Sequence, residues 1–266
     1  MTRTKARLDV VLAERGLVQS RERAQALILA GAVTVDGSVV VKAAAAVELD
    51  AAIEVTAPGD EFASRGGHKL SAALDAFDMT ADGMVAVDVG ASTGGFTDVL
   101  LRAGAARVYA IDVGYGQLAW RLRTDPRVVV MERTNFRNLE SLPERPRIAT
   151  VDVSFIGLRL ILPALSRVTG EDCEAIVLIK PQFEAGRENI EKGGVVRDPA
   201  VHRAILDSVI RSAGGAGWGA RGLIASPLLG PAGNREFLAH LSRVERPAPD
   251  IKEMVDSVVA TESPRL

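Results

Sequence analysis

Two charged residues stand directly after apolar runs that are typical of buried strands. Asp152 ends the run IATV, and Lys180 ends the run AIVLI. Only six of the 32 basic residues are lysines, so a lysine at a strand end stands out. A lysine amine can lose its proton at accessible cost, whereas an arginine guanidinium cannot. Because the carboxyl ends of parallel strands meet at the ligand edge of a sheet, this pair predicts a base beside a carboxylate.

The segment MVAVDVGASTGGFTD, residues 84–98, combines an apolar β-branched run, a glycine-rich turn and the start of a helical pattern. This order is typical of the first strand of an open α/β sheet with a ligand at the turn. The spacing is not G-x-G-x-x-G, so it favours a nucleoside ligand without a diphosphate. The candidate ligand-binding residues of this segment are Asp88, Gly90, Ala91, Ser92, Thr93, Gly94, Gly95 and Phe96.

Three further residues are candidates for the same ligand. Asp112 closes the next apolar run, VYAID, and an acid at that place suits the two hydroxyls of a ribose. Val113 follows it directly. Asn135, after the third strand of this region, is a candidate for the adenine edge, and a capping role in a turn is equally compatible with its position.

The glycine-rich turn also fits G-x-S-x-G, the nucleophile elbow of α/β-hydrolases, with Ser92 as the nucleophile. In hydrolases the elbow usually follows several strands of the sheet, whereas this turn follows the first strand of its region. Only His202 and His240 lie downstream to act as the base. The hydrolase interpretation is therefore the less favoured one.

Composition bounds the class of protein. The 266 residues are 47% hydrophobic, enough for one large domain or for a large and a small one. No apolar stretch approaches the roughly 18 to 20 residues of a membrane span, and the start lacks the apolar core of a signal peptide. The single cysteine, Cys173, fits a reducing cytoplasm. Three scattered histidines show no ligand spacing, so no metal is expected.

Positive charge is concentrated near the start of the chain. The net charge is −2, yet residues 1–42 carry seven basic residues against four acidic ones, a local excess of three. Such an excess is compatible with a solvated helix face and equally with a surface that contacts RNA phosphates. The candidate RNA-binding residues of this region are Arg3, Arg7, Ser20, Arg21, Arg23 and Lys42.

The pattern of elements predicts two domains. Residues 1–60 show two short helices (8–15 and 21–30) and a few short strands, and residues 61–65 form the expected linker. Residues 66–245 alternate strands with helices, which predicts a mostly parallel sheet with helices on both faces. The expected strands cover 84–89, 107–112, 127–131, 148–153, 175–180, 218–225 and 235–242. The expected helices cover 69–77, 97–103, 117–123, 158–166 and 199–213. A tail from 246 to 266 completes the chain.

The first domain resembles the S4 RNA-binding domain. The pattern is a helix, a second helix begun by Ser20-Arg21, and then the turn Val35-Asp36-Gly37. The matching residues are Arg7-Leu8-Asp9, Gly16-Leu17, Ser20-Arg21, Ala24, Ile28, Gly31-Ala32-Val33, Val35-Asp36-Gly37 and Lys42. The resemblance implies a compact α+β module that grips RNA by its shape and charge.

The larger domain resembles the FtsJ-like ribose methyltransferases, whose Rossmann-like α/β sheet binds S-adenosylmethionine. The matching segments are SRGGHKL (64–70), DVGASTGGFT (88–97), DVGYGQL (112–118), DVSFI (152–156), KPQFE (180–184) and GGVV (193–196). With the S4-like module in front, the chain resembles the TlyA family of ribosomal RNA ribose methyltransferases, also called haemolysins. One departure is the segment Glu61-Phe62-Ala63, where relatives often carry an aromatic–Val pair.

The resemblance implies a catalytic tetrad of Lys69, Asp152, Lys180 and Glu236. In this interpretation Lys180 is the base or proton acceptor, and Asp152 orients it and faces the methyl–sulfonium region. Lys69 and Glu236 position the ribose and tune Lys180.

The resemblance also implies a cytidine in ribosomal RNA as the target, on free RNA or on ribosomal subunits. Phe155 is a candidate for stacking on a flipped base, and a place in the core is nearly as compatible with its sequence context. Arg133 and Arg137 are candidates for phosphate contacts.

Three other classes of function are weighed against the methyltransferase. A non-catalytic RNA-binding or ribosome-assembly factor is disfavoured by the intact Lys-Asp-Lys-Glu set. A pore-forming haemolysin is disfavoured because the sequence has no long apolar or strongly amphipathic segment. The hydrolase is the least favoured. The sequence leaves the oligomeric state open.

Overall fold

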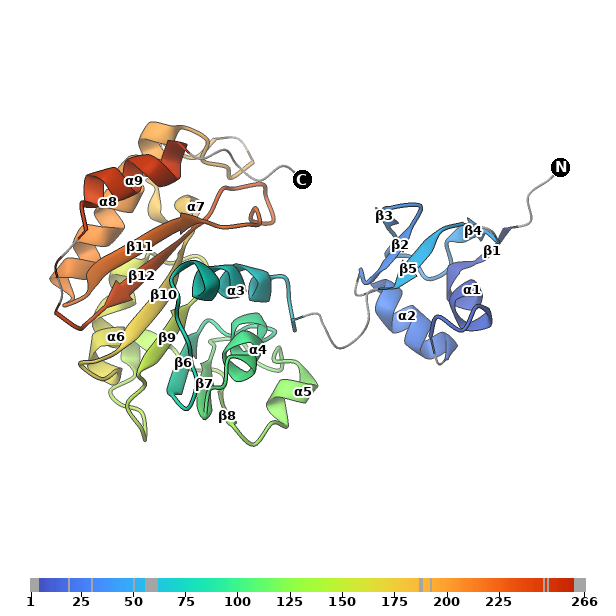
Figure 1. Cartoon of the computed structure of the whole chain (residues 1–266), viewed down its shortest axis with the longest axis horizontal. Helices are drawn as coiled ribbons and strands as arrows, with labels where there is room; N and C mark the ends of the chain where they lie inside the picture. Colours follow the sequence, from blue (N-terminus) through green and yellow to red (C-terminus); the bar gives the residue numbers. More distant parts are fainter. Residues whose placement is uncertain are drawn as a thin grey trace. The chain divides into compact units, whose positions relative to one another are not determined.

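The computed structural model describes residues 5–18, 20–29, 31–49, 51–55, 62–186, 189–191, 193–245, 247 and 249–260, and the side chains of Arg23 and Ala26 are also outside the description. The chain divides into two compact units, Met1–Glu61 and Phe62–Leu266 (Figure 1). Of the candidate RNA-binding residues, Arg3 and the side chain of Arg23 therefore lie outside the described part.

The smaller unit packs two helices against short strands. Its elements are β1 (Lys5–Arg7), α1 (Leu8–Glu14), α2 (Arg21–Leu29), β2 (Val33–Val35), β3 (Ser38–Val39), β4 (Ala46–Glu48) and β5 (Ile53–Val55). β1 pairs antiparallel with β4, and a second sheet has the order β3-β2-β5. Leu8, Leu12 and Ile28 are fully buried between the helices and strands. Asp36 and Gly37 both adopt positive φ, as the tight hairpin between β2 and β3 requires.

The larger unit is built on a seven-stranded sheet of order β11-β12-β10-β9-β6-β7-β8. Its strands are β6 (Val85–Val89), β7 (Arg107–Ile111), β8 (Val128–Met131), β9 (Ile148–Val151), β10 (Glu174–Ile179), β11 (Gly219–Ala225) and β12 (Phe237–Ser242). The five neighbouring strands β10, β9, β6, β7 and β8 are parallel to one another. β12 is antiparallel to both β10 and β11. The sheet is therefore mostly parallel, as the strand–helix alternation indicates.

Helices cover both faces of this sheet (Figure 1). The helices are α3 (Gly66–Ala76), α4 (Gly95–Arg102), α5 (Trp120–Arg123), α6 (Leu162–Val168), α7 (Pro181–Glu184), α8 (Pro199–Gly215) and α9 (Ile251–Ala260), with 3₁₀ turns η1 (Phe136–Asn138) and η2 (Leu158–Leu160). One buried apolar cluster joins α3, α4 and α5 to the sheet, and the other joins α6, α8 and α9 to it. Because both faces are covered, the central strands are continuous apolar runs.

Three helices differ clearly from their expected extents. The helix expected over 69–77 begins already at Gly66. The helix expected over 117–123 begins only at Trp120. The helix expected over 158–166 is divided into η2 and α6, and Pro163 stands in the first turn of α6. Proline is tolerated there because its nitrogen would lack an intrahelical partner in any case.

Two expected boundaries also change. Within the expected linker, Phe62 and Ala63 pack against the apolar cluster of α3 and α4, and the Ala63 N–H donates to Asp98 Oδ2 at 2.9 Å. Within the expected tail, α9 buries Val255 and Val258 in the core beside α8. Both segments therefore belong to the larger unit.

Candidate functional site

Two adjoining cavities open at the carboxyl edge of the sheet. The first, of about 390 Å³, is lined by the start of α3, the glycine-rich turn, the ends of β9 and β10, and the loop before β12. The second, of about 520 Å³, is lined by the ends of β6, β7 and β9 and by the loop after β8. Gly90, Ser92 and Asp152 line both cavities, so the two form one continuous site.

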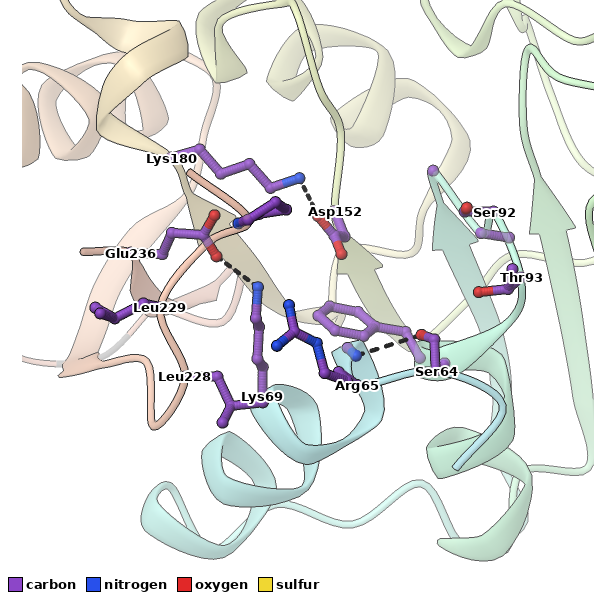
Figure 2. Close-up of a pocket in the computed structure, with 16 residues that line it drawn as sticks. Ser64, Arg65, Lys69, Ser92, Thr93, Asp152, Lys180, Leu228, Leu229 and Glu236 are labelled. Carbon is purple, nitrogen blue, oxygen red and sulfur yellow. Dashed lines mark hydrogen bonds and ion pairs between the residues drawn. The ribbon is translucent and has the colours of Figure 1, made fainter. Parts of the chain in front are cut away.

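The four tetrad candidates come together in the first cavity as two ion pairs (Figure 2). Lys69 on α3 places its Nζ 2.5 Å from Glu236 Oε2, and both side chains are buried. Lys180, directly after β10, places its Nζ 2.6 Å from Asp152 Oδ1, directly after β9. The strand-end positions bring Lys180 and Asp152 together because β9 and β10 are parallel neighbours.

Two carboxylate oxygens of this set are buried without a hydrogen-bond donor. Asp152 Oδ1 and Glu236 Oε1 accept no hydrogen bond from any residue that the structure describes. The close contact of Lys180 with Asp152 Oδ1 is an ion pair without hydrogen-bond alignment, and the aligned bond of Lys180 Nζ goes to Ser154 Oγ at 2.9 Å. A buried acceptor without a donor is costly, so these oxygens are suited to receive hydroxyl donors from a ligand.

The glycine-rich turn passes very close to the end of β9. Gly90 has a φ of 86°, and a Cβ there would lie 2.3 Å from the backbone oxygen of Asp152. Gly94 has a φ of 96°, and a Cβ there would lie 2.3 Å from Leu122 Cδ1. Glycine at both positions lets the backbone bend back and present Ala91, Ser92 and Thr93 to the first cavity.

Asp88 lies beneath this turn, outside the lining of both cavities. It is completely buried, and its carboxylate accepts hydrogen bonds from Thr97 Oγ1 at 2.7 Å and Thr150 Oγ1 at 2.9 Å. Burial raises the pKa of Asp88 to about 6, although the hydrogen bonds from the two threonines lower this pKa in part. In this geometry Asp88 has no surface open to either cavity, and it supports the turn from below, so its expected ligand contact stays a prediction. Gly94 also lies outside both linings.

Asp112 stands at the end of β7 with its carboxylate at the second cavity. Its Oδ2 accepts the Ser92 N–H at 2.8 Å, and its Oδ1 accepts the Gly114 N–H at 2.7 Å. These bonds fix the carboxylate and leave lone pairs for the hydroxyls of a ribose. Val113 and Asn135 also line this cavity. Asn135 Oδ1 accepts the Arg137 N–H at 3.2 Å, so its side chain caps η1.

Phe155 is 91% exposed, which excludes the place in the core that its sequence context allowed. Its φ is 64°, a left-handed conformation that is costly for an aromatic residue and is concentrated at functional sites. Its ring lies 5.0 Å from the ring of Phe183. Arg133, also with positive φ, stacks its guanidinium 4.1 Å from the exposed ring of Tyr115.

In the smaller unit, one buried carboxylate holds two of the candidate RNA-binding arginines. Asp9 accepts hydrogen bonds from Arg7, Arg21 and Gln25 at 2.8 to 3.0 Å. The Arg7 guanidinium in particular holds the pKa of Asp9 well below its usual range. Both arginines remain about half exposed, so they are oriented and still accessible. Ser20 begins α2, where its carbonyl accepts the Ala24 N–H, and Lys42 is exposed.

The structure adds residues that sequence reasoning did not select. Ser64 and Arg65 line the first cavity, and Figure 2 shows the Arg65 guanidinium beside Lys69. Ser154 lines the second cavity. Ser64 and Arg65 belong to a segment that matches the FtsJ-like pattern, and Ser154 stands two residues after Asp152 in another. These matching segments could therefore have identified all three residues.

The hydrolase alternative finds no support in the arrangement of the described residues. Ser92 Oγ donates to Gln117 Oε1 at 3.3 Å, and neither His202 nor His240 lines a cavity with it. His202 Nε2 bonds to the backbone oxygen of Val196, and His240 Nε2 bonds to Glu174. In the part of the chain that the structure covers, no helix is both long and apolar enough to cross a membrane.

Comparison with known proteins gives two family matches. Residues 62–243 match the FtsJ-like methyltransferase family, and residues 6–53 match the S4 domain. The chain is 49% identical over 246 residues to "Putative rRNA methyltransferase YqxC" of Bacillus subtilis, covering 91% of this chain and 87% of that protein. It is 47% identical over 257 residues to "16S/23S rRNA (cytidine-2'-O)-methyltransferase TlyA" of Mycobacterium tuberculosis, covering 96% of each.

A solved structure described as "Putative hemolysin from Streptococcus thermophilus" aligns with a TM-score of 0.76 at 42% identity. The alignment covers 96% of this chain and 94% of that one. Both units of the present chain therefore have counterparts in a single solved protein.

Proposed function

This chain belongs to the FtsJ-like methyltransferase family, and from that premise we propose that it methylates the ribose 2′-hydroxyl of a cytidine in ribosomal RNA. The proposed methyl donor is S-adenosylmethionine, and the proposed place of action is the cytoplasm. The observation that carries the proposal is the two lysine–carboxylate ion pairs, one buried and one half-buried, that line a cavity beside the glycine-rich turn.

The second cavity fits the nucleoside part of S-adenosylmethionine. Its volume of about 520 Å³ lies in the range of sites for small molecules. Asp112 offers an oriented carboxylate for the ribose hydroxyls, and Val113 offers an apolar surface for the adenine. Gly90 lets the ligand approach the backbone, and Asp152 faces both cavities, as a group beside the sulfonium must. When bound, this cofactor supplies a methyl group activated by a positively charged sulfur.

The chain's own residues position the RNA hydroxyl and remove its proton. After the Lys180 ammonium has released one proton to water, its neutral Nζ accepts the proton that the 2′-oxygen gives up, and the carboxylate of Asp152 stabilises the ammonium that forms again. Glu236 Oε1, which is buried and has no donor among the described residues, accepts a hydrogen bond from the ribose. Lys69 holds Glu236 in place, so much of the rate comes from fixed geometry.

The target nucleotide must leave its helix to reach this cavity. The exposed ring of Phe155, with the half-buried ring of Phe183 beside it, offers a surface on which an extracted base can stack. Arg133, stacked on Tyr115, offers a positive charge for nearby phosphates. The S4 unit supplies a second grip through Arg7 and Arg21.

The test is methyl transfer by the full chain to ribosomal RNA and ribosomal subunits, read by mass mapping of ribose methylation. Lys180→Ala should lower the rate at least about 100-fold, because general base catalysis contributes roughly that much. Lys252→Ala, an exposed lysine on α9, is the control and should keep the wild-type rate. Near-normal transfer by Lys180→Ala would show that the assigned base is wrong. No transfer by the wild-type protein to any of these RNAs would favour a non-catalytic RNA-binding factor.

A further inference from the structure

The Lys180 amine has one aligned hydrogen-bond acceptor in the described part of the chain, the hydroxyl of the exposed residue Ser154. Lys180 Nζ donates to Ser154 Oγ at 2.9 Å with hydrogen-bond alignment. The same nitrogen lies 2.6 Å from Asp152 Oδ1, yet that oxygen accepts no hydrogen bond from the residues described. Asp152 therefore contributes charge to the amine, whereas Ser154 contributes direction.

This hydrogen bond connects a residue of the first cavity with a residue of the second. Ser154 lines the second cavity, Lys180 lines the first, and Asp152 lines both. The methyl group must pass from one cavity to the other, so the bond lies beside the path of the reaction. The next residue, Phe155, has a φ of 64°, and such a conformation persists only where the surrounding structure fixes it.

We propose that Ser154 is a positioning residue for Lys180. An amine nitrogen is tetrahedral, so fixing one N–H on Ser154 Oγ restricts the directions left for the position that meets the ribose hydroxyl. A displacement of about 1 Å in a reacting group can cost roughly 100-fold in rate, so this restriction matters for catalysis. The inference rests on the proposed function, because Ser154 acts only through Lys180.

The first experiment compares Ser154→Ala with Ser154→Thr in the full chain, measuring kcat, KM for RNA and the Kd of S-adenosylmethionine. Ser154→Ala should lower kcat about tenfold, equivalent to about 1.4 kcal/mol, with KM and Kd within about twofold of wild type. Ser154→Thr should recover most of kcat, because its hydroxyl can accept the same hydrogen bond. Ser208→Ala, an exposed serine on α8, is the control. Wild-type kcat in Ser154→Ala, or equal losses in the Ala and Thr variants, would overturn the inference.

The second experiment adds Ser154→Ala to a Lys180→Ala chain and follows the residual transfer over long incubations. If Ser154 acts through Lys180, the second change costs nothing further, because the group it positions is gone. A further tenfold loss in the double variant would show that Ser154 acts on its own. Normal rates in Lys180→Ala alone would instead refute the base assignment, so the two failures are distinguishable.

Discussion

At the scale of single residues, the buried carboxyl of Asp88 makes the stability of the fold depend on pH. Its burial raises its pKa to about 6, while an aspartate in an unfolded chain has a pKa of about 3.9. Between these two pH values the folded protein binds this proton more often than the unfolded chain does. The free energy of unfolding therefore falls as pH rises from about 4 to about 6, by as much as about 3 kcal/mol from this group.

Asp88→Asn removes the titrating group and keeps its shape. We expect the variant to lose this part of the pH dependence and to be at least as stable as wild type at pH 7, since the amide can still bond both threonines. Urea unfolding at several pH values between 4 and 7 measures the difference in slope. Asp75→Asn, an exposed carboxylate on α3, should keep the wild-type slope. Parallel curves for wild type and Asp88→Asn would contradict the assignment.

The sequence predicts four charged residues that line the first cavity but does not single out Arg65, and it leaves open which groups their side chains contact. Lys180 and Asp152 could be placed together because each ends an apolar run, and strand ends share an edge. The contact between Lys180 and Ser154 depends on how the loop after β9 bends, which an unusual φ at Phe155 decides. The sequence also leaves the exposure of Phe155 open. Two neighbouring apolar residues, Phe155 and Ile156, are too few to show a periodicity that would assign one of them to the core.

At the scale of elements, the turn between β6 and α4 has no room for a side chain at Gly90. Gly90→Ala would force a Cβ to within 2.3 Å of a backbone oxygen at a positive φ, so the turn must move. We expect a loss of about 1–3 kcal/mol in the free energy of unfolding and weaker binding of S-adenosylmethionine. Chemical denaturation and calorimetry measure the two effects.

Gly214→Ala is the matched control for that change. Gly214 lies in the last turn of α8, and a Cβ there meets no atom within 4 Å. The substitution should raise the free energy of unfolding by up to about 1 kcal/mol, because alanine favours the helix. If Gly90→Ala matched this control in stability and in cofactor affinity, the close approach of β6 to β9 would not be a constraint.

The long elements are predictable from continuous apolar runs in the strands and from helical periodicity, whereas very short strands and tertiary contacts are not. β1 and β4 contain three residues each, too few to alternate, and they went unpredicted. The antiparallel direction of β12 comes from its place between β10 and β11, which is a tertiary property. α9 lies in the segment that the sequence predicts only as a tail, because its core contacts are with segments far away in the sequence.

At the scale of the whole molecule, the two units divide the work between them. The proposed catalytic site lies entirely within Phe62–Leu266, and the oriented arginines lie within Met1–Glu61. The net charge of −2 hides this division, because the positive excess is confined to one end of the sequence. RNA affinity and cofactor affinity should therefore be separable by substitution.

Arg7→Gln and Arg21→Gln test this separation, since glutamine can still donate to Asp9 while the charge is lost. Each variant should weaken RNA binding and reduce the slope of log K against log salt by about 1, because one phosphate contact is removed. The Kd of S-adenosylmethionine should stay at the wild-type value, and Lys252→Gln on α9 should change neither quantity. Binding titrations from 50 to about 300 mM salt measure the slopes. Unchanged slopes in both arginine variants would mean that the basic end of the chain is a solvated face and that the RNA grip lies elsewhere.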